Sequence, residues 1–371
     1  MVNTNDGSDE PCATGNPCNA TLPEQGRRSP WTRVRIFAMN PFVAAQTHAL
    51  VENIRLLEAF VTAPLGLYSD IRMLREALPL EGASDLTQSE SQERRLGYRG
   101  LTAKPGLLAL RAAIQVEDAL VTLTSVKEGD GPVLKPEWVS QAQKVMTRVL
   151  QRVGNDVRSE AAARVRGLYV IIDPEVTGGR PVPEVARAAL EGGAMVLQYR
   201  NKNGAAADIL PEALEMGALC HEHGALFIMN DDPTLAAASG AAGLHVGQQD
   251  LPVPEARRFL GLERLVGRSN NNMDEVSESV TMGADYLAVG AVFPTSTMGK
   301  STRQVVGPDF VKTAKQFADQ PIVAIGGINE SNVRQVVVVG ADCICVVGAV
   351  TLADDPRTAT KSLVEAISNA N

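Results

Sequence analysis

From Arg166 onward, short runs of apolar and β-branched residues alternate with Ala- and Glu-rich stretches, and this alternation restricts the fold more than any other feature of the sequence. Several runs follow a glycine at the end of a helical stretch, where glycine closes the helix in a left-handed conformation. The pattern therefore predicts repeated βα units. The eight runs are GLYVIID, MVLQYRN, ALFIMND, GLHVGQQD, RLVGRSN, YLAVGAVF, PIVAIGG and CICVVGAV.

Eight βα units in about 200 residues match a compact (β/α)8 TIM barrel better than an open doubly wound sheet, which the count alone leaves as the alternative. A barrel also predicts where functional residues lie in the sequence, because functional groups in such barrels lie at the carboxyl ends of the strands. We therefore predict an α/β barrel over residues 166–371 and search the strand ends for chemistry.

The first half of the chain follows a different pattern. Residues 1–32 are rich in Asn, Asp, Gly, Pro and Ser, and we expect them to form a disordered polar head. Residues 33–165 show helical spacing, with Leu50, Ile54 and Leu57 on one face and Pro136 near a helix start. We expect a smaller all-α domain there.

Composition and charge exclude several classes of protein. The chain of 371 residues has a formal net charge of −8, which gives no general electrostatic reason to bind nucleic acid or an anionic membrane. It shows neither a spanning apolar run nor a secretory signal, so a cytoplasmic protein is expected. Five cysteines make no disulfide framework, and Cys343 and Cys345 are expected to be small buried hydrophobes on one strand face.

The second strand run ends in three polar side chains at alternating positions. Gln198, Arg200 and Lys202 point to one side if the strand continues, and they would then converge on the mouth of the barrel. Three donors on one face suit an anion. A solvated strand end with ordinary Lys and Arg is the alternative.

Carboxylates end the third and fourth strand runs. Neighbouring strands lie about 4.8 Å apart, so Asp231 and Asp250 can reach one small hard cation. Magnesium held by two carboxylates, with substrate phosphates and water completing its shell, is the expected use of such a pair. Asp232 has another interpretation, as the N-cap of a helix that begins at Pro233.

The last three strand runs end in hydroxyl-rich or glycine-rich turns. VFPTSTMGK follows the sixth run, while AIGGIN and CVVGAV place glycines where barrels commonly hold a phosphate on backbone N–H groups. The strand ends thus predict one phosphate at strands six to eight and a metal-bound anion at strands two to four. Two phosphorylated small molecules in one site indicate a transferase that joins them.

The motifs LQYRNK, MNDDPTLA, GLHVGQQDLP, GADYLAVGAVFPTST and PIVAIGGIN resemble the thiamine phosphate synthase family, over residues 166–365. The resemblance implies that 4-amino-5-hydroxymethyl-2-methylpyrimidine pyrophosphate is coupled to 4-methyl-5-(2-phosphoethyl)thiazole. Thiamine phosphate forms, pyrophosphate leaves, and Mg²⁺ is the cofactor. It also implies that the pyrimidine pyrophosphate ionises to a carbocation, which the thiazole nitrogen attacks.

The resemblance also implies roles for individual residues, transferred by motif. The pyrimidine pyrophosphate would be held by Gln198, Arg200, Lys202, Asn230 and Ser269, and magnesium by Asp231 and Asp250. The thiazole phosphate would be held by Thr295, Ser296, Thr297, Gly326, Gly327, Val347 and Gly348. Arg200, Lys202, Ser269 and Lys300 are the expected catalytic residues.

Four places depart from the family pattern. The family usually has a Ser near Gly348, a small loss if the backbone N–H makes the contact. The family usually has Glu where Asn201 lies, and Ser-x-His-Thr where this chain has SNNN at residues 269–272. It usually has Lys directly after Thr-x-Thr, where this chain has Met298. Lys300 lies two residues further on, and we predict that it supplies the missing charge; a solvated Lys300 is the alternative.

Two other functions are considered. A thiazole tautomerase on the same barrel relies on a histidine after the fifth strand, where this chain has Asn270 to Asn272. The missing histidine, with Asp231 and Asp250 present, favours the synthase over this isomerase. A barrel that binds phosphorylated ligands without catalysis is the second alternative, and Met298 in place of the family's Lys leaves it open. The helical half resembles, more weakly, an extension found in some family members. We expect a packing or oligomerisation module there, and a homo-oligomer is left open.

Overall fold

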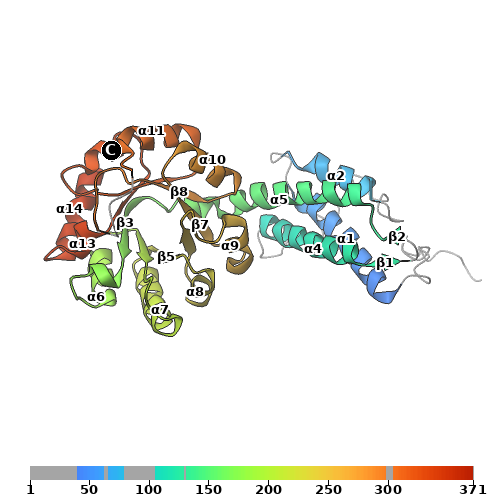
Figure 1. Ribbon diagram of the computed structural model, residues 1–371, viewed down its shortest axis with the longest axis horizontal. Coiled ribbons are helices and arrows are strands. Elements are labelled where there is room, and N and C mark those ends of the chain that lie inside the picture. Colours follow the sequence, from blue (N-terminus) through green and yellow to red (C-terminus); the bar gives the residue numbers. More distant parts are fainter. Residues whose placement is uncertain (1–39, 62–65, 79–104, 129–130, 298–303, 371) are drawn as a thin grey trace, which may run out of the picture.

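The computed structural model describes residues 40–61, 66–78, 105–128, 131–297 and 304–370. Figure 1 shows two parts side by side, a group of helices from the first half of the chain and a barrel from the second half. The polar head predicted over residues 1–32, and the residues Met298 and Lys300, lie outside the described ranges.

Eight parallel strands close into a barrel in the order β10-β3-β4-β5-β6-β7-β8-β9. Each strand falls in one of the eight predicted runs, so the prediction of a (β/α)8 barrel is confirmed and the open sheet was the wrong alternative. The strands are β3 (Gly167–Ile172), β4 (Val196–Tyr199), β5 (Leu226–Asn230), β6 (Gly243–Val246), β7 (Leu265–Asn270), β8 (Tyr286–Val289), β9 (Ile322–Ile325) and β10 (Cys343–Val346).

Helices surround the barrel on its outer face, as Figure 1 shows. The predicted cap of α8 is confirmed, because the Asp232 carboxylate accepts hydrogen bonds from the backbone N–H groups of Thr234 and Leu235. The helical segments are η4 (Pro174–Val176), α6 (Val182–Glu191), α7 (Ala206–Glu222), α8 (Pro233–Ala238), α9 (Val253–Leu260), α10 (Met273–Thr281), α11 (Gly307–Phe317), α12 (Val333–Val337), α13 (Gly348–Thr351) and α14 (Pro356–Ser368).

Alternate residues of each strand belong to different cores, as the period of two requires. On β3, Leu168 and Val170 pack outward against the helices, while Tyr169 and Ile171 lie in a separate cluster inside the barrel. Cys343 and Cys345 of β10 belong to the interior cluster, which confirms that they are buried on one strand face. The barrel interior is thus filled by side chains below the carboxyl ends of the strands.

The first half contains the helices α1 (Pro41–Phe60), α2 (Tyr68–Glu76), α4 (Pro105–Ser125) and α5 (Pro136–Ala162) around a core of their own. Leu50, Ile54 and Leu57 are buried there, as their spacing predicts. Two antiparallel strands of two residues each, β1 (Lys127–Glu128) and β2 (Gly131–Pro132), were not predicted, because so short a pair carries no alternation. Across the described ranges we find no helix with the length and apolarity needed to span a membrane.

Helix α5 connects the two parts. Its end and the turn after it contribute Ala162 and Val165 to the cluster inside the barrel. One turn earlier, Arg158 Nε lies 2.8 Å from Asp285 Oδ1, just before β8, and both side chains are buried. The last turn of α5 therefore covers the amino ends of the strands, opposite the expected site.

Candidate active site

A cavity of about 780 Å³ opens at the carboxyl ends of the strands. Ser296 is exposed and does not line it, and Lys300 lies outside the described residues. The predicted site residues that the structure places around this cavity are Gln198, Arg200, Lys202, Asn230, Asp231, Asp250, Ser269, Thr295, Thr297, Gly326, Gly327, Val347 and Gly348.

Asp231 and Asp250 lie together at the ends of β5 and β6. Burial raises the pKa of Asp231, and the hydrogen-bonded Asp250 carboxyl raises it further, against the lowering effect of Lys202. Lys202 Nζ lies 3.0 Å from Asp231 Oδ2. Asp231 also has φ of 60°, a left-handed conformation that non-glycine residues adopt mainly at functional sites. The pair is thus a site that favours a shared positive charge.

Arg200 is held beside the same cavity by Asp173, a buried carboxylate at the end of β3. Asp173 Oδ2 forms an ion pair with Arg200 Nη1, and Asp173 Oδ1 accepts from the Glu175 N–H. Asn201 points elsewhere: its Nδ2 donates to the Tyr199 hydroxyl at 3.2 Å. The positive guanidinium is therefore fixed in orientation by a partner below it.

Threonines and glycines form the other wall of the cavity. Gly327 has φ of 65°, and a Cβ there would lie 2.5 Å from the carbonyl oxygen of Pro294, so this turn requires glycine. A Cβ added to Gly348 would lie 3.2 Å from Thr297 Cγ2. The turn after β8 therefore lies directly against the turns after β9 and β10, with hydroxyl and backbone groups brought together.

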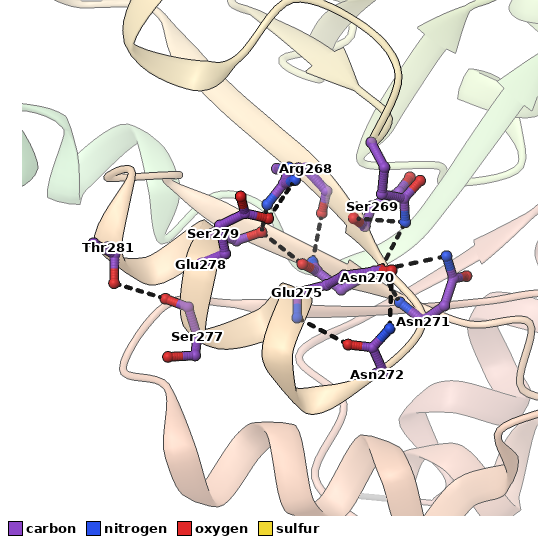
Figure 2. Close-up of polar contacts among 11 residues, drawn as sticks. Arg268, Ser269, Asn270, Asn271, Asn272, Glu275, Ser277, Glu278, Ser279 and Thr281 are labelled. Atoms are coloured by element: carbon purple, nitrogen blue, oxygen red, sulfur yellow. Dashed lines mark hydrogen bonds and ion pairs between the residues drawn. The ribbon is translucent and has the colours of Figure 1, made fainter.

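The three asparagines after Ser269 hold the turn between β7 and α10, as Figure 2 shows. The buried Asn270 donates from Nδ2 to the carbonyl oxygens of Arg268 and Ala288, at 2.8 and 3.3 Å. Glu275 accepts from the Asn271 N–H at 2.7 Å and from Asn272 Nδ2 at 2.9 Å, while the Asn272 side chain accepts from the Glu275 N–H. These contacts fix the backbone beside Ser269.

Three polar residues inside the barrel were missed by the sequence analysis: Tyr169, His245 and Tyr286. His245 lines the cavity, with Nε2 2.9 Å from Ser269 Oγ and Nδ1 3.2 Å from the Tyr286 hydroxyl. Burial lowers the pKa of His245 to about 4, and burial raises the pKa of both tyrosines, so the imidazole is neutral and the hydroxyls keep their protons. The only signal in the sequence was their inward position in otherwise apolar runs.

Comparisons with known proteins agree with this geometry. A family model for thiamine monophosphate synthase matches residues 168–350. The thiamine-phosphate synthase of Shouchella clausii is 38% identical over 207 residues, which cover 55% of this chain and 97% of that protein. The pyrophosphorylase structure titled "Thiamine phosphate pyrophosphorylase from Pyrococcus furiosus" superposes with a TM-score of 0.52 at 34% identity, and covers 57% of this chain and 98% of that chain.

Some relatives are similar beyond the barrel. The thiamine-phosphate synthase of Thermosynechococcus vestitus is 41% identical over 286 residues, covering 70% of this chain and 81% of that protein. The matched share of this chain is larger than the barrel itself, so part of the helical half has a counterpart there. A Synechococcus relative with the same description is 41% identical over 220 residues, and this chain spans only 61% of its length.

These matches confirm the predicted resemblance, the transferase class and the role in thiamine biosynthesis. The curated relatives named above are all described as synthases, not as isomerases or non-catalytic binding proteins. Together with the closed barrel and the site at its strand ends, they show that this chain belongs to the thiamine-phosphate synthase family.

Proposed function

We propose that the cavity binds 4-amino-5-hydroxymethyl-2-methylpyrimidine pyrophosphate and 4-methyl-5-(2-phosphoethyl)thiazole together, and joins them into thiamine phosphate with release of pyrophosphate. One observation carries the proposal: two walls suited to anions face one cavity. One wall carries the cations Arg200 and Lys202 beside the Asp231–Asp250 pair, which suits an anion once a metal ion is bound. The threonine and glycine turns form the other wall.

Magnesium fits the first wall. Two carboxylates share one small space, and the pKa of Asp231 is raised by burial and by its acidic neighbour, so a cation there relieves an existing repulsion. Among the described residues no group of three or more His, Cys, Asp or Glu forms a complete metal cage. Mg²⁺ with two carboxylates, substrate phosphates and water requires no more than this pair. When bound, it would neutralise charge on the pyrophosphate.

The residues of this chain would support departure of the pyrophosphate in defined ways. As the carbon–oxygen bond breaks, its electron pair moves to the leaving pyrophosphate. Arg200, oriented by Asp173, and Lys202 then stabilise the charge that accumulates there. Gln198, Asn230 and Ser269 hold the pyrimidine substrate, and the thiazole nitrogen attacks the resulting carbocation. Lys300 is proposed as a further cation for the same leaving group.

The second substrate would be positioned by its phosphate. Thr295 and Thr297 offer hydroxyl groups, and the turns at Gly326 and Gly327 and at Val347 and Gly348 offer backbone N–H groups. Because these turns lie against each other, their hydroxyl and backbone N–H groups would contact one phosphate together. Binding both substrates in one orientation lowers the entropic part of the barrier. A cytoplasmic location and a homo-oligomer remain predictions.

The test is direct. Purified protein is incubated with both substrates and MgCl₂, and thiamine phosphate and pyrophosphate are quantified, with each single-substrate mixture as the control. Equal amounts of the two products are expected, and chelation of the metal should stop their formation. Folded protein that gives no product with saturating substrates would contradict the proposal.

A further inference from the structure

Six polar side chains form a continuous hydrogen-bond chain across the inside of the barrel. It begins at Ser269 on β7 and ends at Asn230 on β5. The consecutive distances are 2.9 Å (Ser269–His245), 3.2 Å (His245–Tyr286), 3.3 Å (Tyr286–Tyr169), 3.0 Å (Tyr169–Gln198) and 2.6 Å (Gln198–Asn230).

The backbone is built to hold this chain. Asn230, His245, Gly267 and Tyr286 are register partners in one row across β5 to β8. The Tyr286 ring crosses the space above Gly267, where a Cβ would lie 2.0 Å from the ring carbon Cζ. The imidazole of His245 stacks on the same ring, with centroids 5.7 Å apart. These contacts fix the rings as well as their polar atoms.

Which group donates in each hydrogen bond can be worked out from the Asn230 end of this hydrogen-bond chain. Gln198 Nε2 donates to Asn230 Oδ1, so Gln198 Oε1 accepts from the Tyr169 hydroxyl. A tyrosine hydroxyl has one proton, so Tyr169 must accept from Tyr286.

Counting one proton for each hydroxyl also assigns the donors in the remaining hydrogen bonds, from Tyr286 to Ser269. Tyr286 has then used its proton and must accept from His245 Nδ1–H. A neutral imidazole with its proton on Nδ1 leaves Nε2 as an acceptor, which accepts a hydrogen bond from the Ser269 hydroxyl.

We propose that Tyr169, Tyr286 and His245 are positioning residues, whose one-way hydrogen-bond chain holds Gln198 and Ser269 in a single hydrogen-bonding orientation before substrate binds. Gln198 and Ser269 lie three strands apart and both line the cavity. Because each link donates only once, the Gln198 amide and the Ser269 hydroxyl are set together. Such preorganisation removes the free-energy cost of reorienting these two polar groups during the reaction.

The histidine tautomer tests the direction of the chain without any substrate. The protein contains four histidines, so the full-length protein gives few ring ¹⁵N signals. The signals that are missing from the spectrum of His245→Gln belong to His245. The proton should be on Nδ1. A proton on Nε2 would mean that the hydrogen bonds run in the opposite direction. An average of both tautomers would mean that the hydrogen-bond chain does not fix the orientation of Gln198 or Ser269. Either result overturns the proposal.

A distant substitution tests whether the chain acts as a unit. Tyr169→Phe removes the acceptor of Tyr286 and the donor to Gln198. Among the described residues, the His245 ring contacts Tyr286 and Ser269 rather than Tyr169. The substitution should nevertheless convert the His245 signals to a mixture of tautomers. It should also lower kcat/KM for the pyrimidine pyrophosphate about tenfold, or 1.4 kcal/mol, with KM for the thiazole phosphate unchanged.

The matched control is Tyr199→Phe. Tyr199 is on the neighbouring β4, but its ring packs against the outer helices and its hydroxyl bonds to Glu212. The control should leave the tautomer unchanged and kcat/KM within twofold. If Tyr169→Phe does not fold, Tyr286→Phe removes the next link and should give the same two changes. Normal tautomer and kinetics in the folded variant would refute the proposal.

The kinetic effect rests on the proposed function, whereas the tautomer does not. If the enzyme makes no thiamine phosphate but His245 carries its proton on Nδ1 and responds to Tyr169→Phe, the reaction is wrongly assigned and the chain is supported. If turnover is normal and the tautomer is on Nε2, the proposed function stands and the chain is refuted.

Discussion

At the scale of single residues, Asp231 and Asp232 are adjacent in sequence but have different tasks. Asp231 lies in the cavity beside Lys202 and Asp250, in a left-handed conformation that Asn also adopts readily. Asp232 caps α8, a task that Asn performs equally well. Replacing each of them by Asn therefore separates the effect on activity of losing a charge inside the site from the effect of losing a charge next to it.

We expect Asp231→Asn to lower kcat by 10²- to 10³-fold, roughly the usual effect of removing one preorganised electrostatic group. The fold should be kept, because the amide preserves the shape of the side chain. Asp232→Asn is the control and should retain activity within about twofold. Steady-state kinetics over a range of Mg²⁺ concentrations measures both. Near-normal activity of Asp231→Asn that is still abolished by a chelator would place the metal elsewhere.

His245 makes stability depend on pH. Its pKa is about 4 in the folded protein, below the ordinary value of 6.5, because burial disfavours the charged ring. The folded state therefore binds the proton less well than the unfolded state. The stabilisation is complete above pH 6.5 and is lost as the pH falls toward 4, by up to about 3 kcal/mol.

Urea unfolding between pH 7 and pH 4 measures this effect. The free energy of unfolding of His245→Gln should fall less steeply over that range than that of the parent protein. His221→Gln, at an exposed position of α7, should follow the parent curve. Parallel curves for the parent and His245→Gln would show that burial does not lower the pKa of His245, because the folded and unfolded states would then bind its proton equally well.

At the scale of elements, α5 shows how one helix serves two cores. Arg158 lies against the barrel, where it donates to Asp285 Oδ1 and to the Leu262 carbonyl oxygen. Asp285 also pairs with Arg257 and accepts from the Val266 N–H, so it stays partly compensated without Arg158. Nearer the helix start, Arg148 pairs with Asp70 at the surface.

Arg158→Ala should lower the free energy of unfolding of the barrel by about 3 kcal/mol, at the lower end of the cost of breaking a buried ion pair, because Arg257 remains. Arg148→Ala should cost less than about 1 kcal/mol, because its ion pair is exposed. Activity of both variants should be normal under conditions in which they are folded, since Arg158 lies opposite the cavity. Equal urea midpoints for the two variants would contradict this difference.

Elements differ in how well the sequence predicts them. The eight strands were predictable because each is a short apolar run between helical stretches, and their order alone brings the strand ends together. Tyr169, His245 and Tyr286 were not, because a polar group inside an apolar run gives no sign of its partners on other strands. Asp173 was missed as well, because its ion pair with Arg200 joins two residues that are 27 positions apart in sequence. Periodicity predicts faces, whereas hydrogen-bond partners depend on register.

At the scale of the whole molecule, the comparisons and the contacts bear on whether the barrel is independent. The match to the Shouchella clausii protein covers nearly all of that protein but only 55% of this chain. A relative therefore exists with little beyond a barrel. In this chain, however, Arg158, Ala162 and Val165 close the amino ends of the strands from outside the predicted barrel boundary at residue 166.

Two truncations test where the barrel begins. We expect the fragment 155–371 to fold and to keep kcat within about twofold, because it retains Arg158, Ala162 and Val165 and the cavity lies at the far end of the strands. The fragment 166–371 lacks all three and leaves Asp285 with one arginine, so it should unfold at lower urea concentration even if its activity is normal when folded. Circular dichroism and turnover assays on both fragments provide the measurement. If the fragment 155–371 were folded but inactive while the full-length chain is active, the helical half would be part of the catalytic apparatus. If the two fragments were equally stable, the last turn of α5 would not be needed to close the barrel.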